Sequence, residues 1–191
     1  MQLIFASQNE NKAKEIKNIL GNGFEILSLN ELGFHDELSE TQNTFEGNAL
    51  EKARFISKFF KADCFAEDSG LEVEALNGEP GVFSARYAGE GKKSSDNNVK
   101  LLDEMKDKTN RRAQFRTVIA LIIDGKEFLF EGIVSGEIAY VLTGEKGFGY
   151  DPLFKPDGYS KSFGELGTEV KNKISHRAEA VMKMKEFLLQ K

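Results

Sequence analysis

The strongest strand signal in the chain is Ala113-Gln114-Phe115-Arg116-Thr117-Val118-Ile119-Ala120-Leu121-Ile122-Ile123, and it decides the fold that the sequence predicts. This run is rich in β-branched residues, which favour strands. Asp124-Gly125 follows it directly and is a typical turn signal. A second run, Phe128 to Ile138, is placed to pair back along the first. The two runs therefore predict a long antiparallel β-hairpin.

Upstream of this hairpin, strand and helix signals alternate. Leu3-Ile4-Phe5-Ala6 predicts a short buried strand, and apolar residues at helical spacing then predict a helix that Gly21 and Gly23 end. A second amphipathic pattern, from Phe45 to Phe60, leads into a strand at Phe65. Together with the hairpin, these patterns predict an α/β fold with a mixed β-sheet and flanking helices.

Two more helices complete the expected elements. Ser94 to Lys108 carries apolar residues on one side, and a closing helix is expected from Ser175 onward. A chain of 191 residues is long enough for one substantial domain and too short for two large ones. Since no linker, repeat or low-complexity stretch interrupts it, residues 1–191 are expected to form a single domain.

The charge balance limits the partners that the protein is expected to bind. Lys and Arg number 26 against 31 Asp and Glu, for a net charge of −5. This acidic balance disfavours sequence-independent binding to DNA or RNA. Any nucleotide partner is therefore expected to be a free one.

Apolar runs and cysteine usage indicate the compartment. No apolar run approaches the ~20 residues that span a bilayer, and the start of the chain lacks the features of a secretory signal. Cys64 is the only cysteine, so an internal disulfide is excluded, which suits a reducing cytosol. We therefore expect no membrane association and a cytoplasmic location. With two histidines and one cysteine, any metal is expected to be bound by oxygen ligands.

The first candidate site lies in Phe65-Ala66-Glu67-Asp68-Ser69-Gly70, where a strand ends in two adjacent carboxylates. Neighbouring carboxylates repel each other, and a divalent cation or a shared proton usually offsets this repulsion. Mg²⁺ suits such a place, because it binds through one or two carboxylates while substrate phosphates complete its shell. The alternative is a solvated turn in which Asp68 only caps a bend.

A second candidate segment, Ser7-Gln8-Asn9-Glu10-Asn11-Lys12, lies between the first strand and the first helix. Helix N-termini favour anions, and Lys12 adds a full positive charge, so the segment predicts a phosphate-binding site. It is not a Walker motif, because G-x-x-x-x-G-K-[ST] occurs nowhere in the chain. The alternative is an ordinary helix cap formed by Ser7 or Asn9.

A third segment, Gly144 to Pro152, is dense in glycine and aromatic residues. Phe148 and Tyr150 are suited to stacking on a flat base, and Pro152 restricts the backbone of Asp151. The segment lacks the dinucleotide G-x-G-x-x-G spacing, and a hairpin loop with incidental aromatics is the alternative.

A fourth segment, Lys171-Asn172-Lys173-Ile174-Ser175-His176-Arg177, gathers hydrogen-bond donors at the start of the last helix. Positive charge opposes the helix dipole there, so a bound anion or a base edge is expected nearby. Arg177 is able to donate two parallel hydrogen bonds to a carbonyl acceptor. A solvated basic turn is the alternative.

Six motifs occur in an order that points to one family. They are Ser7 to Lys12, Thr44 to Ala53, Glu67 to Leu71, Pro80 to Tyr87, Phe148 to Pro152, and Ser175 to Arg177. In these motifs the chain resembles the inosine/xanthosine triphosphate pyrophosphatases, which remove non-standard purine nucleotides. The resemblance covers nearly the full length, and six ordered motifs are far more specific than any one of them.

The resemblance implies a role for each matching residue. The residues implied to contact the triphosphate are Ser7, Gln8, Asn9, Glu10, Asn11 and Lys12. Asp68 is implied as the metal-associated general base, Ser69 as a substrate contact and Glu40 as a second magnesium ligand. The residues implied for nucleotide recognition are Phe148, Gly149, Tyr150, Asp151, Lys171, His176 and Arg177. One departure is Gly47, where the family pattern has a glutamate directly before Asn48.

The activity that the resemblance implies is Mg²⁺-dependent hydrolysis of ITP, dITP and XTP to the nucleoside monophosphate and pyrophosphate. Family members are elongated α/β proteins with two lobes and a central cleft, and are typically homodimers. Two other functions remain open: a sensor that binds a purine triphosphate without hydrolysing it, and a pyrophosphatase for modified pyrimidines or other nucleotides. The acids Glu67 and Asp68 favour hydrolysis over sensing, because binding alone gains little from a poised carboxylate pair.

Overall fold

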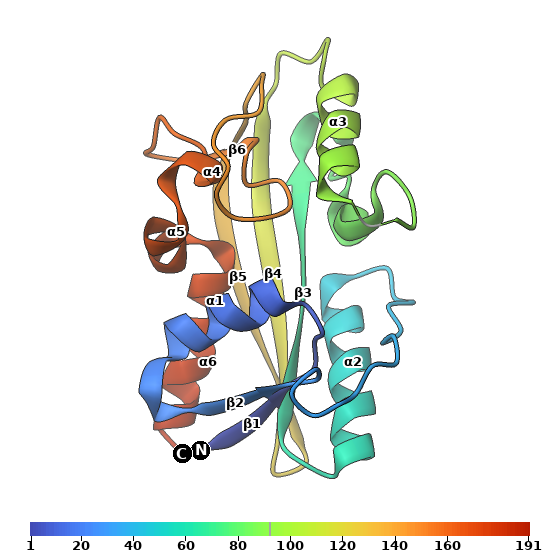
Figure 1. Cartoon of the computed structure of the whole chain (residues 1–191), viewed down its shortest axis with the longest axis vertical. Helices are drawn as coiled ribbons and strands as arrows, with labels where there is room; N and C mark the ends of the chain where they lie inside the picture. Colours follow the sequence, from blue (N-terminus) through green and yellow to red (C-terminus); the bar gives the residue numbers. More distant parts are fainter. Residues whose placement is uncertain (92) are drawn as a thin grey trace. The chain divides into compact units, whose positions relative to one another are not determined.

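A six-stranded sheet with the order β2-β1-β3-β4-β5-β6 organises the computed structural model, which describes residues 1–91 and 93–191 (Figure 1). The strands are β1 (Gln2–Phe5), β2 (Glu25–Ser28), β3 (Cys64–Val73), β4 (Arg112–Ile123), β5 (Lys126–Ile138) and β6 (Phe154–Pro156). β1 is parallel to both β2 and β3, whereas β5 is antiparallel to β6. The predicted mixed sheet is therefore confirmed.

Helices flank this sheet, as the sequence predicts. They are α1 (Glu10–Leu20), α2 (Phe45–Phe60), α3 (Ser94–Glu104), α4 (Phe163–Leu166), α5 (Thr168–Ile174) and α6 (His176–Leu189), with short 3-10 turns η1 (Gly21–Gly23), η2 (Glu74–Leu76) and η3 (Gly81–Arg86). Helix α3 ends four residues before the expected Lys108. The buried Arg111 donates from Nη1 to the carbonyl of Met105 at 2.8 Å, which satisfies a helix-end acceptor where the chain turns away.

The chain divides into two compact units. Unit 1 comprises residues 1–68, 117–132 and 177–191, and unit 2 comprises residues 69–116 and 133–176. Strands β3, β4 and β5 each contribute residues to both units, as their bounds require.

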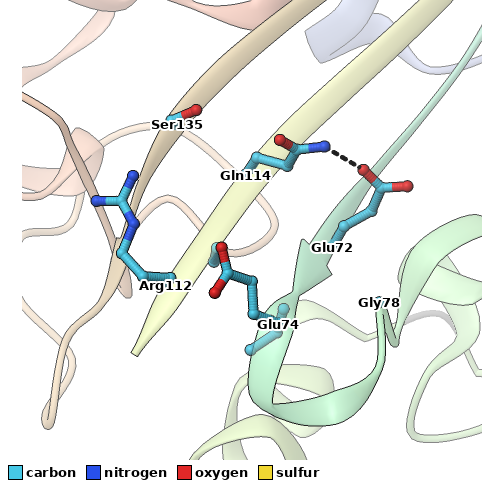
Figure 2. A pocket seen from close by; sticks show the side chains of 8 residues that line it. Glu72, Glu74, Gly78, Arg112, Gln114 and Ser135 are labelled. Atoms are coloured by element: carbon cyan, nitrogen blue, oxygen red, sulfur yellow. Dashed lines mark hydrogen bonds between the residues drawn. The ribbon is translucent and has the colours of Figure 1, made fainter. Parts of the chain in front are cut away.

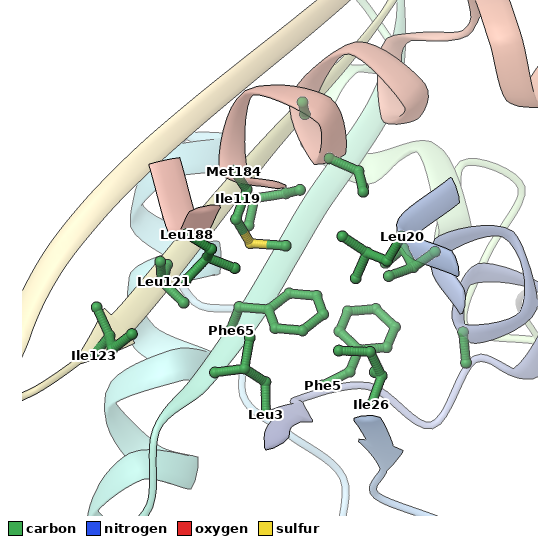
Figure 3. Packing of buried hydrophobic residues seen from close by; sticks show 14 residues of the cluster. Leu3, Phe5, Leu20, Ile26, Phe65, Ile119, Leu121, Ile123, Met184 and Leu188 are labelled. Atoms are coloured by element: carbon green, nitrogen blue, oxygen red, sulfur yellow. The ribbon is translucent and has the colours of Figure 1, made fainter. Parts of the chain in front are cut away.

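In unit 1, both faces of the sheet are covered, and strand alternation decides which residue faces which helix. Leu3, Phe5 and Phe65 pack with apolar residues of α1 and α6 (Figure 3), and the Phe5 and Phe65 rings stack at 5.0 Å. Ile4 and Ala66 pack instead with α2 on the other face. Successive β3 residues therefore point alternately toward α1 and α6 or toward α2.

Unit 2 has its own apolar core. Leu71 and Val73 of β3 pack there with Leu101 of α3, and the aromatic residues of this core are Tyr87, Phe115, Tyr150, Phe154 and Phe163. The loop before β6 is thus anchored by residues that are part of the core.

The sequence does not predict β2, β6, α4 or α5. Each spans three to seven residues, too short for a periodic pattern to stand out. Among the described residues, no helix combines the length and the apolar character that a membrane span requires.

Candidate active site

The prediction that a strand ends at Glu67 and Asp68 is wrong, because β3 continues through both acids to Val73. The two side chains point in opposite directions. Glu67 follows Phe65 by two residues and lies on the face of α1 and α6, whereas Asp68 follows Ala66 and lies on the face of α2. Glu67 is 2% exposed and Asp68 is 5% exposed. Each buried carboxylate therefore needs its own partners.

Glu67 is held by two cations. Arg177 donates from Nε to Oε2 at 2.8 Å and from Nη2 to Oε1 at 3.0 Å, and Lys12 Nζ lies 3.0 Å from Oε1. Arg177 also donates from Nη1 to Glu15 Oε2 at 2.6 Å. Burial opposes ionisation of Glu67, but the charges of Arg177 and Lys12 hold its pKa well below the ordinary range. These four side chains form a charged cluster that fixes the Lys12 ammonium at the start of α1.

Asp68 has a different environment. Asn48 donates from Nδ2 to Asp68 Oδ2 at 3.0 Å, and Lys52 Nζ lies 3.7 Å from Oδ1. Burial raises the pKa of Asp68, with Glu40 contributing in the same direction, while Lys52 and Lys12 oppose the rise. Asp68 is thus a buried carboxylate with a raised pKa, and the ammonium group of Lys52 lies beside it.

Lys52 connects Asp68 to Glu40. Its Nζ lies 2.5 Å from Glu40 Oε1, so a single ammonium serves both carboxylates. Among residues 1–91 and 93–191, no group of three or more His, Cys, Asp or Glu side chains is placed to hold a metal ion. Glu40 and Asp68, which both lie near Lys52, supply two carboxylates. This number fits Mg²⁺, which takes one or two carboxylates from a protein while water and phosphate complete its shell.

Gly47 explains how the segment carrying Glu40 reaches this place. Helix α2 begins after Thr44, whose Oγ1 accepts from the Gly47 N–H at 3.0 Å. A Cβ at position 47 would lie 2.6 Å from Gln42 Cβ. The Gln42 N–H in turn donates to Asn48 Oδ1 at 2.9 Å. A side chain at position 47 would therefore require the segment around Gln42 to move away from the start of α2.

The segment Ser7 to Lys12 contains the helix cap that was the alternative to a phosphate site. Asn9 is the N-cap of α1 and accepts from the Lys12 N–H at 3.1 Å, and Ser7 Oγ accepts from the Asn9 N–H at 3.1 Å. Gln8 Nε2 donates to the carbonyl of Asp36 at 3.0 Å. Glu10 and Asn11 are exposed. A cap does not exclude anion binding, because it sets the helix N-terminus beside the Lys12 ammonium.

In unit 2, the loop Phe148–Asp151 is built around a buried ion pair. Lys171 Nζ binds Asp151 Oδ2 at 2.7 Å and lies 4.3 Å from the centre of the Phe148 ring. The Phe148 N–H donates to the same Asp151 oxygen at 2.8 Å. Lys171 is 3% exposed and Asp151 is 1% exposed. Of the four segments predicted from sequence, the third and fourth thus meet in this ion pair.

Tyr150 lies elsewhere than a stacking role would place it. It is 4% exposed, belongs to the unit 2 core, and donates from its hydroxyl to the Ser84 carbonyl at 2.9 Å. Phe148 is only half-buried, so it is the ring of this loop that a base could reach.

Two other predicted contact residues lie outside this loop. Ser69 is half-buried. His176 is 4% exposed, and the centre of its ring lies 4.7 Å from that of Phe115, on which it stacks.

Arg177 also differs from its expected surroundings. The side chain is 1% exposed, and Nε, Nη1 and Nη2 all donate to the carboxylates of Glu67 and Glu15. The geometry favours a supporting role for Arg177, in which it holds Glu67 and through it Lys12.

Three site residues were missed by sequence reasoning: Glu15, Asn48 and Lys52. Asn48 and Lys52 are four residues apart on α2 and are buried on the face that also carries Ala49 and Ala53. Glu15 is buried beside Ala13 and Ile16 on α1. The sequence signal that could have identified these three residues is a polar residue at a position on the apolar face of a helix. Such a side chain is buried, so it needs a bonding partner.

A pocket of about 280 Å³ in unit 2 contains none of the predicted site residues. Most of its polar side chains bind one another or a neighbouring residue. Gln114 Nε2 donates to Glu72 Oε2 at 2.7 Å (Figure 2), and Arg112 pairs with Asp157. This pocket is therefore not part of the candidate active site.

Comparisons with known proteins agree with the ordered motifs. The dITP/XTP pyrophosphatase of Flavobacterium psychrophilum is 52% identical over 187 residues, which cover 98% of each chain. That of Porphyromonas gingivalis is 50% identical over 98% of this chain and 97% of its own.

Solved structures lead to the same family. The Ham1 protein of Staphylococcus aureus superposes with a TM-score of 0.89 at 42% identity, over 100% of this chain and 99% of its own. A HAM1 protein from Coxiella burnetii gives 0.91 at 35% identity, over the full length of both. The sequence model of the Ham1 family matches residues 3–187. The chain therefore belongs to the Ham1 family.

Proposed function

We propose that this protein hydrolyses non-standard purine nucleoside triphosphates, ITP, dITP and XTP, to the nucleoside monophosphate and pyrophosphate. The observation that carries the proposal is the buried Asp68 carboxylate, whose pKa burial raises and beside which the Lys52 ammonium lies. It is supported by about 50% identity to dITP/XTP pyrophosphatases along nearly the whole chain.

Charge neutralisation is the first task of such a site. Phosphoryl transfer depends mainly on positioning and on electrostatic stabilisation of the phosphate oxygens. The protein carries a net charge of −5, so local cations have to attract the triphosphate. Lys12 is held at the start of α1 by Glu67, and Lys52 lies beside Asp68. We assign the triphosphate to these two lysines and to the segment Ser7 to Lys12.

Asp68 is the proposed general base. Its raised pKa makes it a better proton acceptor than an exposed aspartate, and the amide of Asn48 fixes the orientation of the carboxylate. A water that attacks the α-phosphorus would transfer its proton to an Asp68 oxygen. The bond that breaks joins the α-phosphorus to the bridging oxygen, which leaves with pyrophosphate.

Magnesium is the proposed cofactor, with Glu40 and Asp68 as the residues that would hold it. When bound, Mg²⁺ would neutralise phosphate charge and stabilise the pyrophosphate leaving group. Lys52, which pairs with both carboxylates, offsets the repulsion between the buried Asp68 and the partly exposed Glu40. Water and phosphate oxygens would complete the Mg²⁺ shell, so a third acidic side chain is not required.

Purine recognition is assigned to unit 2. Phe148 offers a half-buried ring for stacking, and main-chain amides of the loop Phe148–Asp151, with Ser69 and His176, are the proposed polar contacts. Hypoxanthine and xanthine carry a carbonyl acceptor at C6, whereas adenine carries an amino donor. A donor of the protein that faces the adenine amino group leaves both donors without an acceptor. Such a mismatch lowers kcat/KM for the adenine nucleotide by on the order of 10⁴.

Further properties implied by the resemblance are part of the same proposal. We treat residues 1–191 as one domain, since β3, β4 and β5 run through both units. A homodimer in the cytoplasm is proposed, and the buried single cysteine is compatible with a reducing compartment. Sedimentation and cell fractionation test these two statements.

The test of function is a panel of nucleoside triphosphates incubated with and without Mg²⁺, in which pyrophosphate and orthophosphate are measured separately. The proposal expects pyrophosphate from ITP, dITP and XTP and little from ATP. Orthophosphate release would mean that another bond is cleaved. Binding without turnover would identify a sensor, and a preference for modified pyrimidines would identify the other type of pyrophosphatase.

A further inference from the structure

Asn98 joins helix α3 to the loop Phe148–Asp151. Its side chain is 5% exposed, and Nδ2 donates to the carbonyl of Gly149 at 3.0 Å across 51 residues of sequence. Asn97 beside it serves another segment, since it accepts from the Ala88 N–H and donates to the Ser84 and Ala85 carbonyls. Asn97 therefore binds the region around η3, whereas Asn98 binds the loop Phe148–Asp151.

The nitrogen and the oxygen of the Asn98 side-chain amide differ in their hydrogen bonding. Within the described part of the chain, Oδ1 is buried without a hydrogen-bond partner. An unsatisfied buried acceptor is costly, whereas an apolar side chain of similar size would avoid this cost. The gain that offsets it at this position is the hydrogen bond to Gly149. This contrast indicates that Asn98 is used for its donor.

The Gly149 carbonyl is a place where the loop needs such an anchor. Gly149 has φ of +62°, and without a Cβ its backbone rotates more freely than that of any other residue. The neighbours on its C-terminal side are fixed independently, Asp151 by Lys171 and Tyr150 by the Ser84 carbonyl. Rotation of the Gly149–Tyr150 peptide would exchange the directions of a carbonyl acceptor and an N–H donor.

We infer that Asn98 is a positioning residue for purine selection, acting through its hydrogen bond to the Gly149 carbonyl. The inference rests on the proposed function, in which main-chain groups of this loop distinguish a C6 carbonyl from an amino group. By holding one orientation of the Gly149–Tyr150 peptide, Asn98 keeps donors and acceptors of the loop in one arrangement. It touches neither the phosphates nor the attacking water in this account.

The test compares two variants with a matched control on the same helix. Asn98→Leu removes the donor at similar volume, and Asn98→Asp keeps the shape while replacing the donor by an acceptor. Val99→Ala is the control, because Val99 is 64% exposed on α3. Hydrogen–deuterium exchange of the peptide containing residues 148–151 and kcat and KM for ITP and ATP are measured, with thermal unfolding as a check of the fold.

Both Asn98 variants are expected to exchange faster in this peptide and to lose about tenfold in the ITP-to-ATP ratio of kcat/KM, the factor that one buried hydrogen bond contributes. The loss should come from a higher KM for ITP, with kcat changed by less than about threefold. Val99→Ala should match the wild type. Wild-type exchange and wild-type preference in a folded Asn98→Asp variant would overturn the inference.

Failure of the proposed function would be recognised separately. It would appear as wild-type protein that releases no pyrophosphate from ITP. The exchange measurement would still decide whether Asn98 anchors the loop, since it needs no turnover.

Discussion

Glu67 and Asp68 are adjacent in sequence, yet their carboxylates lie on opposite faces of β3 and have opposite pKa shifts. Glu67 is kept ionised by Arg177 and Lys12, while burial makes Asp68 more basic than an exposed aspartate. The alternation of a strand thus separates two acids that would otherwise repel each other. Glu67 is surrounded by cations, whereas Asp68, which binds Asn48 and lies beside Lys52, has a raised pKa.

Lys52 should influence both activity and its pH dependence. Lys52→Met removes the ammonium shared by Glu40 and Asp68, and turnover of ITP is expected to fall by about 10²-fold. Lys52 lowers the pKa of Asp68, so its removal raises that pKa further. Because the base must be deprotonated, the acidic limb of the kcat/KM profile should move to higher pH. The exposed Lys58→Met on the same helix is the control, and an unshifted limb would contradict the assignment.

Substitutions of Arg177 distinguish between two roles for this residue, positioning of Glu67 and Lys12 or direct contact with the purine. Arg177→Ala leaves Glu67 and Glu15 buried without their main cation, which is expected to cost about 3–5 kcal/mol of stability. Arg177→Lys keeps the charge but not the paired hydrogen bonds to Glu67. If Arg177 acts through Glu67 and Lys12, KM should rise by a similar factor for ITP and ATP. A selective loss for ITP would instead support contact with the base.

Acid should weaken the fold through Glu67. The pKa of Glu67 in the folded protein is below its ordinary value of 4.5, so its contribution to stability is complete above that value. As pH falls below it, the unfolded chain takes up a proton that the folded protein excludes, and stability decreases. Urea unfolding between neutral pH and about pH 3.5 should show a smaller loss for Glu67→Gln than for the wild type. Equal losses in the two proteins would mean that other groups dominate.

Much of the fold was predictable because its main elements carry clear periodic patterns. The hairpin β4–β5, the helices α1, α2, α3 and α6, and the strands β1 and β3 follow from alternating or helical spacing. The burial of the strand around Phe65 and Ala66 was predictable, but its end was not, because β3 continues past Asp68 to Val73. The predictable features depend on neighbours in sequence, which a single chain displays directly.

The partners of the site residues were less predictable, because they come from distant segments. Arg177 looked like a free double donor, but its partner Glu67 is 110 residues away and Glu15 is 162 residues away. Tyr150 looked like a stacking residue, whereas its hydroxyl binds the carbonyl of Ser84, 66 residues earlier. Residue type gives bonding capacity, but only the fold decides whether that capacity is already used.

The most direct test of the account is pyrophosphate release from ITP with Mg²⁺ by Asp68→Asn. The asparagine keeps the size of the side chain and removes the proton acceptor, so kcat is expected to fall by about 10²–10⁴-fold while the protein stays folded. Glu127→Gln, which alters an exposed carboxylate paired with Arg54, should retain wild-type turnover. A folded Asp68→Asn variant that releases pyrophosphate at a rate close to that of the wild type would contradict the central claim.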